Sequence, residues 1–122
     1  MTDYLSLEIV ARQGAKRGLV LRDPGLLDAA IHRPQVTIFG EDAYPTIALK
    51  AAALLHSITQ GQAFLDGNKR MAVLSADAFV ELNGHRITAS EDDLYELLAV
   101  EIPDGLHDIE IIAARLKVQP RG

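Results

Sequence analysis

A short polar stretch, Gly61-Gln-Ala-Phe-Leu-Asp-Gly-Asn-Lys-Arg70, connects the two most apolar segments of this chain. Residues 47–58, upstream of it, carry few polar side chains, and residues 71–82, downstream, are also rich in apolar residues. A helix that is apolar nearly all round is normally buried. The pattern therefore predicts two central, buried helices joined by a connection that is unusually rich in charged residues.

The second of these helices is expected to begin near Asn68, and its start has the features of an anion site. The first backbone N–H groups of a helix have no partner within the helix, and the positive end of the helix dipole lies there. Gly67 lets the backbone approach a phosphate closely, while Lys69 and Arg70 add cationic donors. Asp66 can hold a divalent ion that bridges phosphates. These residues predict a site for the phosphates of a nucleotide.

An ordinary connection between helices is the alternative interpretation of the same stretch. In that case Phe64 fills the core, Asp66 and Asn68 cap the following helix, and Lys69 and Arg70 are solvated. The chemistry of the residues, taken alone, leaves both interpretations open.

Capping residues and apolar spacing predict four further helices, which makes the chain all-α. Their expected N-caps are Ser6, Asp23, Ser90 and Asp108. The helices themselves are expected over residues 7 to about 16, from Pro24 to Pro34, from Glu91 to Pro103-Asp-Gly105, and from 109 through 116. Pro45 can begin the first of the two central helices. The last residues, Gln119–Gly122, are expected to form a frayed tail.

The composition restricts the class of protein. With 122 residues, the chain is long enough for one domain that buries a core of its own. It contains no cysteine, so disulfides and thiolate chemistry are excluded, which fits a reducing cytoplasm. Its net charge of -5 and scattered basic residues argue against binding to DNA or RNA. No apolar run reaches the roughly 20 residues that span a membrane. We expect a cytoplasmic, single-domain protein.

The segment Phe64-Leu-Asp-Gly-Asn-Lys-Arg70 resembles the Doc version of the Fic/Doc family motif, His-x-Phe-x-Asp/Asn-x-Asn-Lys-Arg. The resemblance covers about residues 5 to 117 and includes Arg22-Asp-Pro-Gly-Leu-Leu27, Arg33-Pro-Gln35, Gly40-Glu-Asp42, Tyr44-Pro-Thr46, Ala51-Ala-Ala-Leu-Leu55, Glu81-Leu-Asn-Gly84 and Ser90. It implies a single Fic/Doc (Fido) domain over residues 1–122. The fold would be a compact bundle of about six helices, with the motif loop at its centre.

The resemblance also implies an activity. Family members with Gly at the position of Lys69 transfer AMP to protein hydroxyls, whereas Doc-type members with Lys there transfer the terminal phosphate of ATP to elongation factor Tu. By resemblance, Asp66 would bind Mg²⁺, and Asn68, Lys69 and Arg70 would hold the phosphates of ATP. Gly67 would shape the phosphate-binding backbone. Lys69 therefore favours the kinase over the alternative, a Fic-type protein adenylyltransferase.

Gln62 departs from the family motif, because the family keeps a catalytic histidine at this position as general base. An amide has no useful basicity near neutral pH, so base catalysis worth roughly 10²–10⁴-fold should be missing. We expect the chain to be inactive or nearly so. Gln62 is compatible with a degenerate natural member, with a deliberate substitution, and with a non-catalytic module that still binds nucleotide or antitoxin.

Two surfaces are expected from the resemblance. Thr37, Ile38 and Phe39 occupy the place of a flap that aligns the target segment by strand pairing, although an ordinary loop is the alternative. A Phd-type antitoxin would bind in a groove lined by exposed apolar residues of the N-terminal helices. His56 is expected to be a hydrogen-bonded core histidine, and the other histidines show no metal-ligand spacing.

Overall fold

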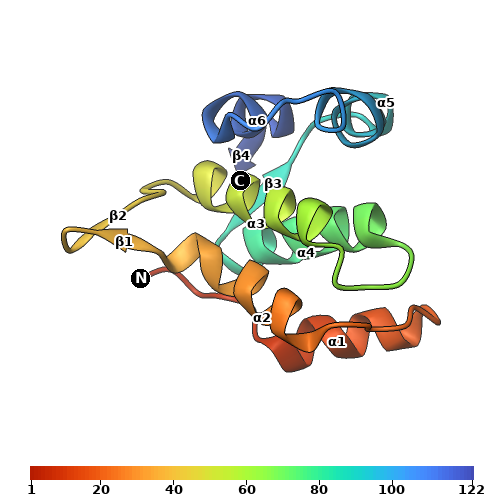
Figure 1. Cartoon of the computed structure of the whole chain (residues 1–122). Helices are drawn as coiled ribbons and strands as arrows, with labels where there is room; N and C mark the ends of the chain where they lie inside the picture. Colours follow the sequence, from red (N-terminus) through yellow and green to blue (C-terminus); the bar gives the residue numbers. More distant parts are fainter.

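Two long central helices, which run in opposite directions, organise the fold of the computed structural model, which describes residues 1–122 (Figure 1). Helix α3 spans Ile47–Gly61 and helix α4 spans Asn68–Leu82, as the apolar segments predicted. The start of α3 differs from the expected Pro45. The Thr46 side chain accepts a hydrogen bond from the Leu49 amide at 3.1 Å, and the helix therefore begins at Ile47.

The remaining helices cover the central pair on two sides (Figure 1). Helices α1 (Leu7–Lys16) and α2 (Pro24–His32) lie on one side, and a 3-10 turn at Arg33–Gln35 ends α2. Helix α5 (Glu91–Tyr95) and helix α6 (Ile109–Leu116) lie on the other. The four predicted N-caps are confirmed, each with a side-chain oxygen that accepts a backbone N–H: Ser6, Asp23, Ser90 and Asp108.

Helix α5 is shorter than the sequence predicted. After Tyr95 the chain continues as a π-helical segment, Glu96–Glu101, in place of a regular α-helix. The wider turn of this segment buries Leu97 and Leu98 against the core.

Two small antiparallel ribbons complete the otherwise helical fold. Strands β1 (Thr37–Ile38) and β2 (Glu41–Asp42) form the hairpin at the expected flap position. Strands β3 (His85–Ile87) and β4 (Val118–Pro120) pair with each other. The prediction of a frayed C-terminal tail was therefore wrong. The tail's backbone hydrogen bonds are satisfied by a strand about 30 residues earlier, a partner that local patterns do not reveal.

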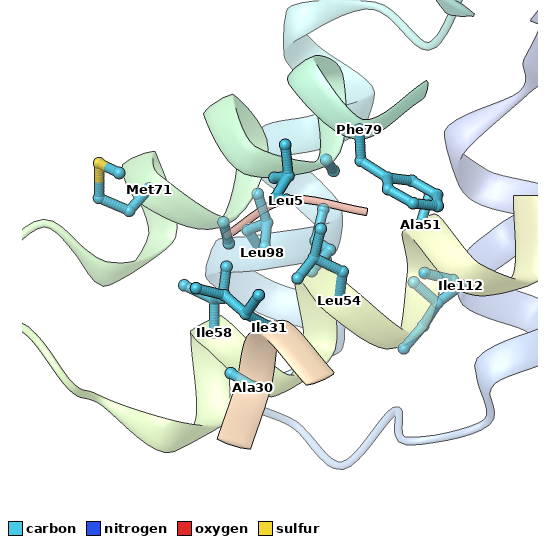
Figure 2. Packing of buried hydrophobic residues seen from close by; sticks show 14 of the residues in the cluster. Leu5, Ala30, Ile31, Ala51, Leu54, Ile58, Met71, Phe79, Leu98 and Ile112 are labelled. Atoms are coloured by element: carbon cyan, nitrogen blue, oxygen red, sulfur yellow. The ribbon is translucent and has the colours of Figure 1, made fainter. Parts of the chain in front are cut away.

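One continuous hydrophobic core joins both sides of the molecule. It contains 23 buried residues, from Leu5 before α1 to Leu116 at the end of α6. Figure 2 shows that side chains of α2, α3, α4 and α6 converge on this core, among them Ile31, Leu54, Phe79 and Ile112. The all-α architecture is confirmed. None of its helices is both long and apolar enough to cross a membrane.

Candidate active site

The loop between α3 and α4 is held rigidly in the core by Phe64. This side chain is only 1% exposed. Helix α1 approaches its ring so closely that a Cβ added at Gly14 would lie 2.6 Å from it, so only glycine fits there. The backbone of the loop also pairs with the segment before α2, because the Leu65 amide donates to the Val20 carbonyl at 2.9 Å.

Asn68 fastens the loop to the start of α4. Its Oδ1 accepts a hydrogen bond from the Phe64 amide at 3.0 Å, and its Nδ2 donates to the Phe64 carbonyl at 2.9 Å. The side chain is thus engaged within the loop. Phosphate binding by Asn68 stays a prediction. It would depend on the two groups that remain free, the backbone N–H and the second hydrogen of the side-chain amide.

The start of α4 differs from every other α-helix of the molecule. The five others are capped by a side chain, whereas Gly67, the N-cap of α4, provides no side-chain hydrogen bond. Gly67 has a φ of 81°, and an added Cβ would lie 2.8 Å from Leu19. The amides of Asn68, Lys69 and Arg70 find no acceptor in the chain. Three N–H groups at a helix start thus remain available to an anion.

A pocket of about 300 Å³ opens over this helix start. It is lined by Thr59, Gln62, Leu65, Asp66, Gly67, Asn68 and Lys69. The structure therefore brings together most of the predicted phosphate site. Arg70 does not line this pocket and lies instead in an adjoining groove, together with Lys69.

Thr59 also lines the pocket, although no motif in the sequence pointed to it. Its side-chain hydroxyl is buried and has no hydrogen-bond partner in the chain. An unsatisfied buried hydroxyl is costly. Thr59 lies one helical turn before Gln62, and this spacing is the only sign of it in the sequence.

Gln62 is exposed at the C-cap of α3, in a left-handed conformation with a φ of 51°. Arg22 orients this position, because its Nη2 donates to the Gln62 carbonyl at 2.8 Å. None of the four histidines lines the pocket, so no imidazole stands there as a general base. The Gln62 side chain lines the pocket.

Asp66 is the only carboxylate in the pocket. Its Oδ1 accepts a hydrogen bond from the Gly67 amide at 2.8 Å, which fixes the side chain. No group of three or more acidic, histidine or cysteine side chains is placed to hold a metal ion. Mg²⁺ is usually held by one or two carboxylates together with substrate phosphates and water. A single oriented carboxylate beside a phosphate-sized pocket fits that manner of binding.

A comparison with known protein families agrees with this geometry. The model of the Fic/DOC family matches residues 3–80, which is more than half of the chain. The chain belongs to the Fic/Doc family. It is also 45% identical over 120 residues to "Toxin Doc" of Mycolicibacterium smegmatis, an alignment that covers 95% of this chain and 92% of the relative. No solved structure matches the sequence.

The β1–β2 hairpin precedes α3 at the position where the Fic/Doc resemblance predicted a flap. Its strand β1 is exposed, and Phe39 at the tip is fully exposed with a φ of 51°. Lys50 of α3 anchors the base of the flap. It is 1% exposed, and its ammonium donates to the Asp42 carboxylate at 3.0 Å and to the Tyr44 carbonyl. Figure 1 places this flap at the opposite end of α3 from the Fic/Doc motif loop.

His56 is hydrogen-bonded, as expected, but it is only partly buried and not a core residue, and it does not line the pocket at the motif loop. Arg33 Nη1 donates to His56 Nδ1 at 2.8 Å, so the proton of the neutral ring lies on Nε2, which is 2.9 Å from His107 Nδ1. Burial, followed by the charges of Arg33 and His107, lowers the pKa of His56 to about 4. Both ring nitrogens of His56 are therefore engaged in hydrogen bonds.

Proposed function

We propose that this chain is a Doc-type toxin whose pocket at the start of α4 binds the triphosphate of ATP together with Mg²⁺. In this proposal the terminal phosphate is transferred to a hydroxyl of a translation factor, elongation factor Tu. The observation that carries the proposal is the open helix start, where the amides of Asn68, Lys69 and Arg70 have no acceptor. Such a site favours phosphate oxygens by hydrogen bonding and by the helix dipole.

Three residues of the pocket and the neighbouring Arg70 have further roles in this proposal. Lys69 and Arg70 supply positive charge to the phosphates, and Arg70 can bind two oxygens at once. Asp66 holds the Mg²⁺ that, when bound, neutralises charge on the phosphates. The buried Thr59 hydroxyl gains a partner when a ligand or its water enters the pocket.

Gln62 would then be the reason for weak or absent activity. Its amide can accept a hydrogen bond from the target hydroxyl and orient it, but it cannot take the proton. Because a positioned general base contributes about 10²–10⁴-fold, transfer should be slow even with ATP and target in place. The rest of the motif loop is intact, and its geometry does not depend on the Gln62 side chain.

The decisive experiment is Gln62→His, assayed with γ-labelled ATP and elongation factor Tu. We expect the variant to label the factor and to stop growth, whereas the parent does neither. A double variant, Gln62→His with Asp66→Ala, is the matched control and should be inactive. Equal labelling by the parent and by Gln62→His would show that position 62 is not the missing base.

The same assay separates two alternatives. A Fic-type adenylyltransferase would transfer label from α-labelled ATP, against the expectation from Lys69. A non-catalytic binding module would bind ATP or antitoxin but transfer no label in either variant, which would agree with a natural Gln62.

The target segment has a defined path in this proposal. A groove of about 480 Å³ runs beside α3, from Val36 at the base of the flap to Gln60 and Gly61 next to the motif loop. We propose that the segment pairs with the exposed strand β1 (Thr37 and Ile38) and follows this groove to Gln62. The flap alone does not reach the phosphate pocket, because the two lie at opposite ends of α3 (Figure 1).

A second groove, of about 280 Å³, fits the expected antitoxin site. Leu5, Ile9 and Val10 of the N-terminal segment line one wall, and α4 lines the other through Leu74. Ile9 is 49% exposed. We propose that a Phd-type antitoxin folds an apolar segment into this groove, in line with the relative's name as a toxin.

Co-purification with the antitoxin tests this groove. Ile9→Asp should abolish the complex, because it places a charge on the apolar wall. Val20→Asp is the matched control, since Val20 is 59% exposed but does not line the groove. Loss of the complex in both variants, or in neither, would contradict the assignment.

A further inference from the structure

Arg33 lies in the groove beside α3 that the proposed target segment would follow. It is partly buried, and no other Lys or Arg and no Asp or Glu lines this groove. Arg33 takes part in none of the five salt bridges of the molecule. The groove therefore holds one permanent positive charge that no carboxylate of the chain compensates.

Neutral groups hold the Arg33 guanidinium in place. Its Nε donates to the Tyr44 hydroxyl at 3.1 Å, and its Nη1 donates to His56 Nδ1 at 2.8 Å and to the Ser57 hydroxyl at 2.9 Å. The guanidinium carbon also lies over the Tyr44 ring, 5.6 Å from its centroid. These contacts fix the direction of the side chain without neutralising its charge.

The guanidinium keeps free donors. Of its five N–H groups, three are used in these bonds, and the two on Nη2 have no acceptor in the chain. Burial, followed by the charges of Arg33 and His107, lowers the pKa of His56 to about 4, so His56 is neutral near pH 7. A partly buried cation without a counter-ion is costly to the fold. An anion that enters the groove would relieve this cost.

We propose that Arg33 selects a target segment with an acidic side chain, Asp or Glu, whose carboxylate binds to Nη2. The proposal rests on the proposed function, in which a protein segment pairs with β1 and follows this groove to Gln62. Asp and Glu are the side chains of a protein that are ordinarily anionic at neutral pH. Their oxygens accept charge-assisted hydrogen bonds from a guanidinium, which are stronger than those between neutral groups. Arg33 is then a specificity-determining residue.

The fold also predicts where the acidic residue stands in the segment. Arg33 bonds to Ser57, which precedes Gln62 by five positions along α3, a rise of about 7.5 Å. An extended segment covers this distance in about two residues. We therefore expect the acidic residue about two or three positions from the target hydroxyl, on the side of the segment that leads to β1.

The test measures binding, so it does not depend on phosphate transfer. The probes are short fluorescein-labelled peptides of alternating Val and Gln around one central Thr, in which a single Glu is moved along the sequence. The parent chain should bind the peptide with Glu about two or three positions from Thr roughly tenfold more tightly than the peptide without Glu, measured by anisotropy. Glu at more distant positions should give no such gain.

Arg33→Gln removes the charge from the groove. Its affinity for the best Glu peptide should fall to that for the peptide without Glu, which should itself be unchanged. Arg86→Gln is the matched control, because it makes the same change of charge on strand β3 and does not line the groove. This control should keep the full preference for Glu.

Four results would overturn the proposal: no binding of either peptide to the parent chain, equal affinity of the parent for both, a preference for Glu that Arg33→Gln retains, and an equal loss for both peptides in Arg33→Gln. The last would show that Arg33 supports the groove without selecting its ligand. The comparison of peptides on the parent chain needs no variant, so it decides even if Arg33→Gln does not fold. The proposed function fails separately, if Gln62→His transfers no label from ATP although the preference for Glu is present.

Discussion

The motif loop and the flap are both short connections at the ends of α3, yet the molecule holds them in different ways. The motif loop is fixed from within, by the buried Phe64 ring and by two hydrogen bonds between the Asn68 side chain and the Phe64 backbone, one donated by each residue. The flap stands away from the core (Figure 1), and its base is held by Lys50. Its tip residue, Phe39, is fully exposed.

This difference matches what each region is proposed to bind. A phosphate site needs donors that are already in place, because their stabilisation of the anion then costs no reorganisation. A surface that pairs with a protein segment can adjust as the segment arrives, since exposed strand edges accept a new strand readily. In the proposed function, the firmly held loop and the exposed flap therefore carry two different tasks at the two ends of α3.

The largest effect is expected from Phe64→Ala, which removes the anchor of the motif loop. Loss of a buried aromatic ring should lower the free energy of unfolding by roughly 3–5 kcal/mol, measured by urea denaturation. Leu65→Ala is the matched control, because the neighbouring Leu65 side chain is 67% exposed and should change stability little. Similar losses in the two variants would contradict the picture of a loop held from within.

A smaller effect is expected from Lys50→Met, which removes the anchor of the flap but keeps an apolar stem. Loss of hydrogen bonds from a charged donor should lower stability by roughly 1.5–3 kcal/mol. Hydrogen exchange should quicken at the Ala43 amide, which donates to the Val36 carbonyl across the hairpin. The Leu65 amide should remain protected. Glu41→Gln is the control, because Glu41 lies on strand β2 beside Asp42, the partner of Lys50, but does not itself bond to Lys50.

A still smaller effect on stability is expected from a change of pH, which acts on His56. This residue belongs to the hydrogen bonds that join Arg33, beside the flap, to α3. The pKa of His56 lies near 4 in the folded chain and near 6.5 when unfolded. The unfolded chain therefore binds a proton between these values that the folded chain does not, so stability falls as pH drops from about 6.5 to about 4. His56→Gln should flatten this part of the curve of melting temperature against pH.

Comparing the parent chain with His56→Gln isolates the contribution of His56 to the pH dependence of stability. The groups that face it, Arg33 and His107, remain in both, as does Asp77, whose pKa is raised mainly by burial and also by Glu81. Asp77 acts in the opposite direction, because its neutral form is favoured as pH falls. Because His56 is partly exposed, the difference in melting temperature should be modest. Parallel curves of melting temperature against pH for the parent and His56→Gln would contradict this role of His56.

The smallest effect on stability is expected from Phe39→Gly at the tip of the flap. Phe39 has a left-handed backbone, which glycine adopts without strain, and its side chain touches no core. The free energy of unfolding should stay within about 1 kcal/mol of the parent. In a Gln62→His background, the variant should nevertheless label the target more weakly. Undiminished labelling would remove the flap tip from target binding.

Local sequence patterns predicted the parts of the fold that depend on neighbouring residues. Ser6, Asp23, Ser90 and Asp108 cap helices as expected, because each bonds to an amide only two or three residues away. The motif stretch likewise identified the family and most of the residues that line the pocket at the start of α4. The expected start of α3 at Pro45 was wrong by two residues, since Thr46 competes as the cap.

The parts that were missed depend on partners far along the chain. The tail pairs with β3 through Ile87 and Val118, and His56 meets His107 across 51 positions. Lys50 is a charged residue in an otherwise apolar helix, and it can be buried because Asp42 and the Tyr44 carbonyl, from the segment before α3, bind its ammonium.

By itself, the sequence determined the helices, their caps and the residues of the motif loop, since these follow from amides and side chains within one or two turns. Only the tertiary structure decided that the start of α4 stays uncapped beneath a pocket, and that Arg33 lies in a groove that no carboxylate lines. The physical reason is that a side chain's burial and free hydrogen-bonding groups depend on which distant segments pack against it.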